Sequence, residues 1–313
     1  MVDGNAIERL RETYAKYITG KTDVLEKMLI AILIKGHVLL EGVPGIAKTR
    51  IARVFAAALG LKFRRVQFVP DLLPADITGT FIYRQDTGKF ELVRGPVFTN
   101  VLLADEINRA PPKTQAALLE AMQERQVTIE GQTFPLEEPF FVIATQNPIE
   151  QEGTYPLPEA QLDRFSFRIL MDLPTPEEEI QILQLAETGN IDALPEPVIT
   201  KGDLLQMREA VNRVYASPAI KEYIRDLVVA TRTHPKIMYG ASPRASITLL
   251  RGAKARAYLE GRTHVLPDDV KYIFMDATNH RVILKPEVEL AGVKVQDVLE
   301  EILKSVKIPE PGR

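Results

Sequence analysis

The segment at residues 42–49, Gly-Val-Pro-Gly-Ile-Ala-Lys-Thr, constrains this chain more than any other. It follows an apolar run at 37–41 and precedes a helix-like segment at 50–59. A strand that ends in a glycine-bearing turn and opens a helix directs backbone N–H groups, and the positive end of the helix dipole, at one point. A triphosphate suits that point, with Lys48 reaching its terminal phosphates and the Thr49 hydroxyl coordinating Mg²⁺. The segment therefore predicts an α/β fold with a phosphate-binding loop.

The loop departs from the usual pattern at one position. Ala47 occupies the place of the second glycine in G-x-x-x-x-G-K-[ST], so the backbone donor is kept while tolerance of unusual φ angles and of close approach is lost. The alternative interpretation is a Gly-Pro turn with an exposed lysine. The residues expected to contact ATP are Gly42, Val43, Pro44, Gly45, Ile46, Ala47, Lys48, Thr49 and Arg50.

Length and composition fit a globular protein of two domains. The chain has 313 residues, of which 45% are hydrophobic and 26% are charged, and its formal net charge is −3. This charge gives no global attraction to nucleic acid or to an anionic membrane, so neither is expected as a partner. A local basic patch would still be compatible with it.

The chain contains no cysteine, which excludes disulfide bonds and thiolate metal sites and fits a reducing interior. Its four histidines lack the spacing of a metal site. No signal peptide is expected, because charged residues interrupt the start of the chain. The most apolar region, residues 28–40, is broken at 35–37 and is too short to span a membrane. A cytoplasmic location is therefore expected.

An apolar run at 101–104 ends in two carboxylates, Asp105 and Glu106. The pattern is typical of a buried parallel strand whose carboxyl end borders a ligand site. Adjacent residues of a strand point to opposite faces, so the two acids should have different roles. Asp105 is the candidate outer-shell partner of Mg²⁺, and Glu106 is the candidate base for the water that attacks the γ-phosphate. An acid pair alone is usually a solvated turn, but after a phosphate-binding loop it indicates an ATPase.

A second wholly apolar strand is predicted at 140–145, and Asn147 lies just beyond its end. In a parallel sheet the amide of Asn147 would border the same crevice, where it could orient the attacking water or contact the γ-phosphate. The alternative is a simple Asn-Pro turn, because Pro148 follows.

Arg244 is a candidate for electrostatic reasons. Ser242 and Pro243 predict the start of a helix, which places Arg244 at the positive end of that helix. A cation there is unfavourable by roughly several tenths of a kcal/mol, so a neighbouring anion should compensate. That anion is either a nearby carboxylate or a phosphate of the nucleotide.

The remaining pattern divides the chain into an α/β domain at 1–188, a proline-containing linker at 189–200 and a helical domain at 201–313. Two β-hairpins are predicted at 81–93 and 126–136, and decoration of a sheet edge is the simplest interpretation of both. No strong strand is predicted in the helical domain. Helices are predicted at 6–17, 23–34, 50–59, 111–126, 158–165, 203–214, 218–234, 243–259, 267–279 and 295–306, and from 175, with strands at 62–68 and 168–173.

Four further motifs accompany the loop at 42–49. They are Leu-Leu-Ala-Asp-Glu-Ile-Asn-Arg-Ala-Pro-Pro-Lys-Thr-Gln at 102–115, Ala-Thr-Gln-Asn-Pro at 144–148, Pro-Glu-Ala-Gln-Leu-Asp-Arg-Phe at 158–165 and Gly-Ala-Ser-Pro-Arg-Ala at 240–245. Together, in this order and without large gaps, the five motifs closely resemble the MoxR family of AAA+ ATPases. The resemblance implies an AAA+ αβα core with sheet order 5-1-4-3-2 and an α-helical lid. It also implies the helix-2-insert group, with the first hairpin as that insert and the second as an insert before sensor 1.

The resemblance implies roles for single residues as well. Lys48 and Thr49 would belong to Walker A, Asp105 and Glu106 to Walker B, Asn147 would be sensor 1, Arg244 sensor 2, and Arg164 the arginine finger. Ala47 resembles a variant that this family tolerates. Arg109 and Arg168 are less certain neighbours of the site, and neither is assigned the finger role ahead of Arg164.

Proteins of the MoxR family are chaperone-like ATPases that work, usually as hexameric rings, with von Willebrand factor A domain partners to assemble or activate protein complexes. The resemblance thus implies ATP and Mg²⁺ as cofactors, a homo-hexamer and such a partner, while the client is not evident from the sequence. A DNA-associated AAA+ motor is an alternative, since helicase subunits share the helix-2 insert, although the acidic balance and the lack of a separate DNA-binding domain count against it. A slow nucleotide-gated scaffold is another, and turnover with and without the partner would separate it from a remodelling ATPase.

Overall fold

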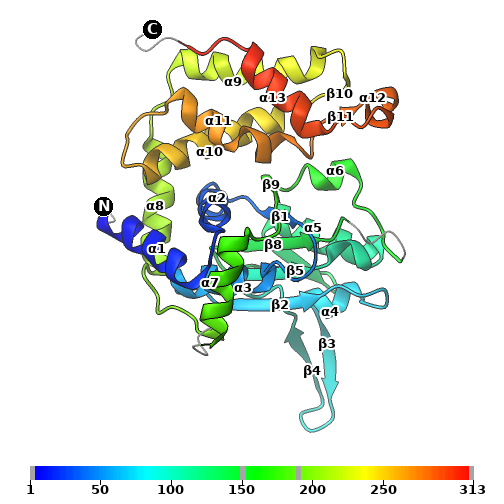
Figure 1. The fold of residues 1–313 in the computed structure, drawn as a ribbon. Helices are drawn as coiled ribbons and strands as arrows, with labels where there is room; N and C mark the ends of the chain where they lie inside the picture. Colours follow the sequence, from blue (N-terminus) through cyan, green and yellow to red (C-terminus); the bar gives the residue numbers. More distant parts are fainter. Residues whose placement is uncertain (1–3, 149–152, 188–191, 310–313) are drawn as a thin grey trace.

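The computed structural model describes residues 4–148, 153–187 and 192–309, which form an α/β core and a helical lid stacked on it (Figure 1). The core contains a sheet of parallel strands in the order β2-β5-β8-β1-β9. These strands are β1 (Val38–Glu41), β2 (Phe63–Gln67), β5 (Val101–Asp105), β8 (Phe141–Gln146) and β9 (Phe167–Leu170). Renumbered along the chain and taken from the β9 edge, this order is 5-1-4-3-2, so the expected topology is confirmed.

Continuous apolar segments form the middle of the sheet. Every residue of β5 is buried, and alternate side chains enter different cores. Val101 and Leu103 pack into a core that is shared with the lid, whereas Leu102 and Ala104 pack into a second core on the opposite face. A strand that is buried on both faces requires an unbroken apolar run, which explains the sequence pattern.

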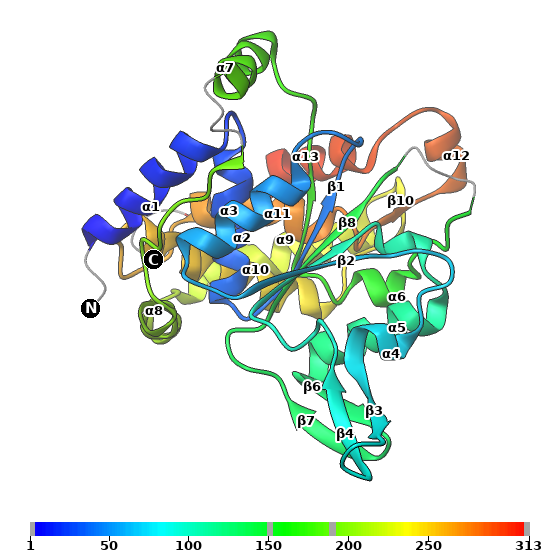
Figure 2. The same ribbon diagram turned by 90° about the horizontal axis from the view of Figure 1, so that it is seen from below.

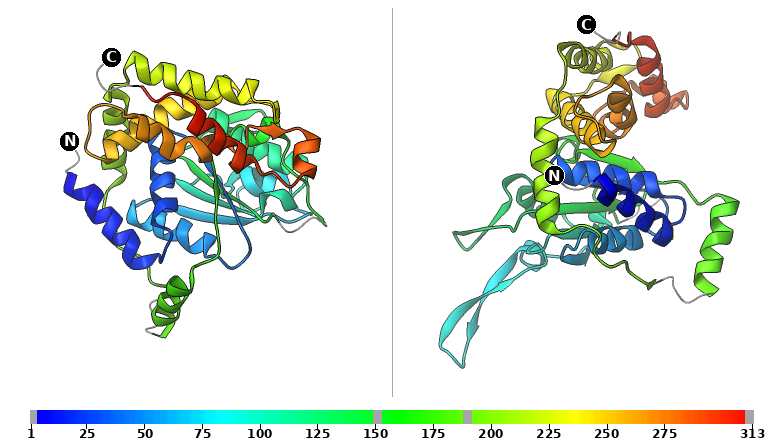
Figure 3. Two further views of the ribbon diagram at one scale, coloured as in Figure 1. Left: turned by 45° about the horizontal axis from the view of Figure 1, so that its top comes forward. Right: turned by 90° about the vertical axis from the view of Figure 1, so that its left-hand side faces the viewer.

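Helices cover both faces of the sheet (Figure 2). Residues of α1 (Gly4–Tyr17), α2 (Thr22–Leu33) and α3 (Lys48–Ala58) belong to the core that the lid shares. Residues of α4 (Pro74–Thr78) and α5 (Pro112–Glu124) belong to the second core. After β8 the chain forms the short α6 (Glu159–Leu162), and α7 (Pro176–Glu187) projects from the core without a buried residue (Figure 3).

The lid consists mainly of helices at the predicted places, together with one at 286–290 that the sequence analysis did not predict. They are α8 (Lys201–Arg213), α9 (Pro218–Thr233), α10 (Pro243–Leu259), α11 (Pro267–Thr278), α12 (Pro286–Leu290) and α13 (Val295–Ser305). The lid also contains an antiparallel ribbon of β10 (Ile237–Tyr239) and β11 (Ile283–Leu284), which the sequence analysis did not predict. Strands of this length are too short to show a periodic pattern.

Core and lid are packed together rather than merely linked. Helix α2 contacts α8 and α10, and α11 contacts β9. The segment before α8 lies along the core, because Val198 N–H donates to the carbonyl oxygen of Ala58 at 2.8 Å. The division at 189–200 lies partly outside the described residues, and the boundaries at 1–188 and 201–313 stay a proposal. Within the described ranges, no helix has the length and apolarity that crossing a membrane requires.

Both predicted hairpins are present. The first joins β3 (Gly79–Arg84) to β4 (Lys89–Arg94), and the second joins β6 (Gln126–Ile129) to β7 (Gln132–Pro135). The β3–β4 hairpin extends away from the rest of the chain (Figures 1 and 3).

The two ends of the β3–β4 hairpin have different surroundings. Near its base, the ring of Phe81 lies 6.4 Å from that of Phe134 of the second hairpin, and Phe81 packs against the second core. Towards the tip, the rings of Tyr83 and Phe90 lie 5.4 Å apart, with exposed fractions of 57% and 69%. The tip therefore presents aromatic side chains that contribute little to the core of this chain.

The tip residues should be dispensable for stability. Because both rings are mostly exposed, Tyr83→Ser combined with Phe90→Ser should shift the thermal midpoint by no more than about 2 °C. The matched control Phe81→Ser removes a partly buried ring and should lower the free energy of unfolding by about 1–3 kcal/mol. Calorimetry of the purified chains compares them, and a large loss in the double variant would show that the tip is structural.

Candidate active site

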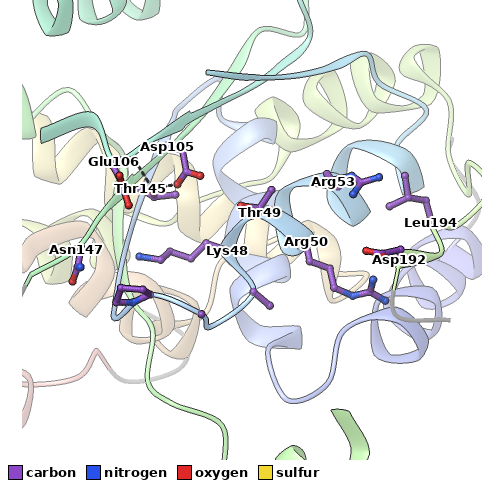
Figure 4. A pocket seen from close by; sticks show the side chains of 13 residues that line it. Lys48, Thr49, Arg50, Arg53, Asp105, Glu106, Thr145, Asn147, Asp192 and Leu194 are labelled. Atoms are coloured by element: carbon purple, nitrogen blue, oxygen red, sulfur yellow. Dashed lines mark hydrogen bonds between the residues drawn. The ribbon is translucent and has the colours of Figure 1, made fainter. Parts of the chain in front are cut away.

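An open cavity of about 430 Å³ lies at the carboxyl ends of β1, β5 and β8, beside the first turn of α3 (Figure 4). Parallel strands in an open α/β sheet place their ligand sites at this edge. The residues that line the cavity are Pro44, Gly45, Ala47, Lys48, Thr49, Arg50, Arg53, Asp105, Glu106, Thr145, Asn147, Asp192 and Leu194. Most predicted site residues thus meet in one place, whereas Gly42, Val43, Ile46, Arg164 and Arg244 are not among those that line it.

The loop between β1 and α3 adopts a conformation that few residues tolerate. Gly45 has φ 86°, and Ala47, immediately before α3, has φ 62° and ψ 23°. The left-handed conformation costs a residue with a side chain about 1–2 kcal/mol. Gly42 is required for space, because a Cβ atom there would lie 2.6 Å from the carbonyl oxygen of Met171. The loop is therefore strained at Ala47, where the sequence analysis noted the departure from glycine.

Lys48 is the first residue of α3, and its side chain points across the loop into the cavity (Figure 4). Its Nζ donates to the carbonyl oxygen of Gly42 at 2.6 Å and to that of Gln146 at 3.2 Å. These bonds hold the ammonium group between the ends of β1 and β8. An anion in the cavity would meet it directly, together with the N–H groups at the start of α3.

The two acids at the end of β5 do not lie as the sequence analysis expected. The strand ends at Asp105, and Glu106 adopts the left-handed conformation with φ 54° and ψ 52°. The prediction that they point to opposite faces of a strand was therefore wrong, because the pleat does not extend to Glu106. Both carboxylates border the same cavity.

Asp105 is held by two neighbours from the adjacent strands. Its Oδ1 accepts from Thr145 Oγ1 at 2.6 Å, and its Oδ2 accepts from Arg65 Nε at 3.0 Å and Nη2 at 2.7 Å. The Thr145 hydroxyl also accepts from the N–H of Glu106 at 2.9 Å. A carboxylate with its oxygens engaged in this way suits an outer-shell partner of Mg²⁺ better than a direct ligand.

Glu106 has partners of its own. Its Oε2 accepts from Gln67 Nε2 at 2.7 Å and from Arg109 Nη1 at 2.9 Å. Gln67 in turn accepts from Arg65 at 2.9 Å, so one hydrogen-bonded chain joins both acids to β2. Arg65, Gln67 and Thr145 were missed by the sequence analysis. The alternation of polar residues in β2 was the available signal, although it does not reveal which residues of β5 they meet.

Asn147 follows β8 and is 4% exposed. Its side chain faces the same space as Lys48 and Glu106 (Figure 4). The predicted position of its amide at the shared edge of the sheet agrees with this geometry.

Thr49 and Asp105 line the same cavity, and their hydroxyl and carboxylate oxygens are the donors that Mg²⁺ prefers. The residues present therefore fit this ion. Within the described ranges, no group of three or more His, Cys, Asp or Glu side chains forms another metal site.

Arg164 and Arg244 are not among the residues that line this cavity, and Arg244 contacts the residue that precedes Arg164. Arg164 follows the end of α6, and Arg244 lies in the first turn of α10. Arg244 Nη1 is 3.5 Å from Asp163 Oδ2 and donates to the carbonyl oxygen of Asp163 at 3.4 Å. The anion that the helix dipole argument required is thus a carboxylate in this structure.

Arg168 is engaged elsewhere. Its guanidinium donates to both carboxylate oxygens of Glu41 on β1, at 2.8 and 2.6 Å. Such a two-point bond between neighbouring strands ties the side chain of Arg168 to β1 of its own chain. Arg109, the second uncertain arginine, contacts Glu106 in its own chain.

A second, more apolar cavity of about 200 Å³ adjoins the first and shares Gly45, Ala47 and Arg50 with it. Its other walls come from the joint between α1 and α2 (Tyr17 to Thr19), Lys21, Ile46 and Ile51, and from Pro174, Ile182 and Leu185. Arg50 donates to the carbonyl oxygen of Tyr17 at 3.2 and 3.0 Å, which fixes that joint. Burial lowers the pKa of Arg50, which Asp192 partly opposes and Arg53 reinforces.

Comparisons with known families identify the class of this fold and site. A family described as "ATPase family associated with various cellular activities (AAA)" matches residues 37–167, and an AAA lid domain matches residues 229–302. Together with the sheet order and the loop, these matches define an AAA+ ATPase.

Individual relatives narrow the assignment. YeaC of Bacillus subtilis (strain 168) is 48% identical over 306 residues, covering 98% of this chain and 94% of YeaC. Chaperone MoxR1 of Mycobacterium tuberculosis is 44% identical over 315 residues, covering 98% of this chain and 83% of that protein. A solved structure from Cytophaga hutchinsonii, described as a candidate ATPase, has a TM-score of 0.92 at 45% identity, covering 98% and 96% of the two chains. The chain belongs to the MoxR family of AAA+ ATPases.

The bridge formed by Thr145 should be essential to this site. Thr145→Val keeps the shape of the side chain but leaves Asp105 Oδ1 and the N–H of Glu106 without this partner. We expect a loss of about 1–3 kcal/mol in the free energy of unfolding and a fall of about 10²-fold in ATP turnover, because Glu106 is displaced. Denaturant titration and a phosphate-release assay measure the two effects.

Thr114→Val is the matched control for that variant. Thr114 is equally buried, and its hydroxyl donates to the carbonyl oxygen of Leu72 at 2.6 Å, away from the cavity. It should lose stability by a similar amount but keep its turnover. Equal turnover in the two variants would contradict the role given to Thr145.

Proposed function

We propose that this protein binds Mg-ATP in the cavity at the carboxyl edge of the sheet and hydrolyses it to ADP and phosphate. The observation that carries this proposal is the convergence of three separate segments on one cavity: the loop with Lys48 and Thr49, the end of β5 with Asp105 and Glu106, and the end of β8 with Thr145 and Asn147. A solvated turn or an isolated Gly-Pro loop would not bring these groups together.

Each group has a defined task in this reaction. Lys48 and the N–H groups that open α3 bind the β- and γ-phosphates. Glu106 accepts a proton from the attacking water, whose oxygen forms a bond to the γ-phosphorus as the bond to the bridging oxygen of ADP breaks. Asn147 orients that water. The Thr49 hydroxyl would hold Mg²⁺ and Asp105 would support it from the outer shell, and the bound ion would neutralise charge on the phosphates.

The second cavity supports a place for the nucleotide base. It is apolar, as a planar base requires, and it adjoins the phosphate end through Gly45, Ala47 and Arg50. We therefore propose that the base lies between the α1–α2 joint and α7, with Ile182 and Leu185 on one side of it. ATP would thus span both cavities.

We further propose that hydrolysis drives chaperone-like assembly or activation of other protein complexes, in a hexameric ring and with a von Willebrand factor A domain partner. The relative named Chaperone MoxR1 supports the chaperone-like part. The exposed aromatic tip of the β3–β4 hairpin supports a surface that faces the ring axis or a partner. The client is left open, and a cytoplasmic location is a prediction from the sequence.

Substitution of Glu106 and Lys48 tests the chemistry. Glu106→Gln keeps the size of the side chain but cannot accept the proton, so ATP affinity should be kept while turnover falls by about 10²–10⁴-fold. Lys48→Ala should instead lose ATP binding. Calorimetric titration with ATP and steady-state phosphate release separate the two effects. Glu120→Gln, at an exposed position of α5, is the matched control and should behave as the wild type. Wild-type turnover in Glu106→Gln would remove Glu106 from the mechanism.

A mixing experiment tests whether Arg164 acts on the ATP of a neighbouring subunit. Arg164 is not among the residues that line the cavity of its own chain. The competing view is a surface pair of Arg164 with Asp163, Glu159 or another acid, which contributes about 0–1 kcal/mol. A pair with Asp163 is disfavoured, because its carboxylate accepts from Arg281 and lies 3.5 Å from Arg244 Nη1. An arginine finger is worth about 10³–10⁵ in rate, so Arg164→Ala should be nearly inactive alone.

Arg164→Ala and Lys48→Ala should recover hydrolysis when mixed, because some interfaces then combine an intact loop with an intact finger. Native mass spectrometry verifies that the rings are mixed. Absence of recovery in such rings, or full activity of Arg164→Ala alone, would refute the finger assignment.

A further inference from the structure

Three consecutive lid residues contact the turn that carries Arg164. Asn279, His280 and Arg281 follow α11 and are all buried. Asn279 Nδ2 donates to the carbonyl oxygen of Arg168 at 2.9 Å, and His280 Nε2 lies 3.0 Å from that of Phe165. Burial lowers the pKa of His280 well below its usual value, which favours a neutral ring that donates to this carbonyl.

Arg281 makes the densest set of these contacts. Its Nε donates to Asp163 Oδ1 at 2.6 Å, and its Nη2 donates to the carbonyl oxygens of Asp163 at 3.1 Å and Phe165 at 2.8 Å. Its Nη1 donates to that of Ser166 at 3.3 Å and also to Ala277 O within the lid. The side chain is only 2% exposed. A rigid, planar guanidinium with this many partners fixes the backbone that it contacts.

Arg164 lies inside the segment that these contacts hold. The residues on both sides of it, Asp163 and Phe165, are bonded to Arg281, whereas Arg164 itself is only partly buried. The helix before it, α6, has a single turn and cannot by itself fix the direction of the arginine. The N–H of Arg164 donates to the carbonyl oxygen of Gln161 at 3.1 Å, and the lid adds side-chain contacts to the backbone on both sides of it.

We propose that Asn279, His280 and Arg281 are positioning residues for Arg164, so that the lid of one subunit sets the rate of ATP hydrolysis in its neighbour. This inference rests on the proposed function, in which Arg164 serves the adjacent site. Asp163 is the point where the coupling converges, since its carboxylate accepts from Arg281 and lies beside Arg244 at the start of α10. A shift of the lid at Arg281 or Arg244 therefore moves the backbone next to Arg164.

The coupling has a definite direction. Arg244 and Arg281 belong to the lid of the same chain as Arg164, and the lid shares a core with α2 and α3 of that chain. A change at the loop before α3 is thus connected, through one packed core, to a residue that acts on another subunit. In this geometry each subunit controls its neighbour's transition state without altering the neighbour's ATP binding.

Arg281→Gln tests this proposal. The variant removes the charge and most of the donors, and a displacement of Arg164 by about 1 Å should lower turnover about 10²-fold while ATP affinity stays that of the wild type. Arg208→Gln is the matched control, because Arg208 is also a buried arginine, 6% exposed, that donates to a backbone carbonyl, Ile32 O, at 2.9 and 2.7 Å. It should lose stability but keep the turnover of the folded protein.

Mixed rings distinguish a positioning role of Arg281 for Arg164 from damage to the ATP site of the same subunit. Arg281→Gln mixed with Lys48→Ala should recover hydrolysis, because the Lys48→Ala subunit supplies a well-placed finger to an intact loop. Mixed with Arg164→Ala it should not recover, because both chains then lack the same function. The reverse pattern, recovery with Arg164→Ala but not with Lys48→Ala, would show that Arg281 serves its own site and would overturn the proposal.

Two further measurements keep the outcome unambiguous. If Arg281→Gln does not fold, Asp163→Asn takes its place, since Asp163 is partly exposed and its substitution weakens the same charged bond. It should show the same mixing pattern with a loss of about tenfold, and wild-type turnover would overturn the proposal. The Arg164→Ala and Lys48→Ala pair is run in parallel. If this pair does not recover hydrolysis, the proposed function of Arg164 is wrong. If this pair recovers but Arg281→Gln shows the reverse pattern, the proposed positioning role of the lid residues is wrong.

Discussion

The hydroxyl group of Thr145 joins the ends of two neighbouring strands, and the placement of Asp105 and Glu106 depends on it. It donates to Asp105 and accepts from the N–H of Glu106, so both acids are placed by a residue of β8. In a parallel sheet these strand ends lie at one edge, where the loop before α3 also begins. The site thus follows from strand order combined with one buried hydrogen-bonded side chain. Without the Thr145 hydroxyl, Asp105 Oδ1 and the N–H of Glu106 would each lose this hydrogen-bond partner in a poorly solvated place.

Local strain accompanies this arrangement. Ala47 and Glu106 both adopt left-handed backbone conformations, which cost a non-glycine residue about 1–2 kcal/mol each, and both border the cavity. The strain at Glu106 is balanced by identified contacts with Thr145, Gln67 and Arg109. At Ala47 the start of α3 holds the backbone, because the carbonyl oxygen of Ala47 accepts from the N–H of Ile51 at 2.9 Å. Rigid surroundings hold these residues where phosphate and water would meet them.

The sequence predicted what depends on local patterns and missed what depends on contacts between distant segments. The loop at 42–49, the apolar strands and the acids after β5 were identifiable because each has its own signature. The resemblance to a known family added the sheet order. The conformation of Glu106 was not predictable, since it depends on Thr145, whose place in an apolar run gave no hint of a polar role. Gln67 and Arg65 were missed for the same reason, and so was Arg281.

A helical lid could be attached to an α/β core by a linker alone, and it would then have little influence on events in the core. Here the lid and one face of the sheet share a single hydrophobic core, in which Met28 of α2 and Leu249 of α10 are both fully buried. Because a close-packed interior transmits displacements instead of absorbing them, a movement at α3 cannot be confined to the core. The buried hydrogen bonds of Arg281 extend this coupling from the lid to one particular place, because they end on the residues beside Arg164. Packing therefore couples the lid to the α/β core, and hydrogen bonds determine which residues respond to that coupling.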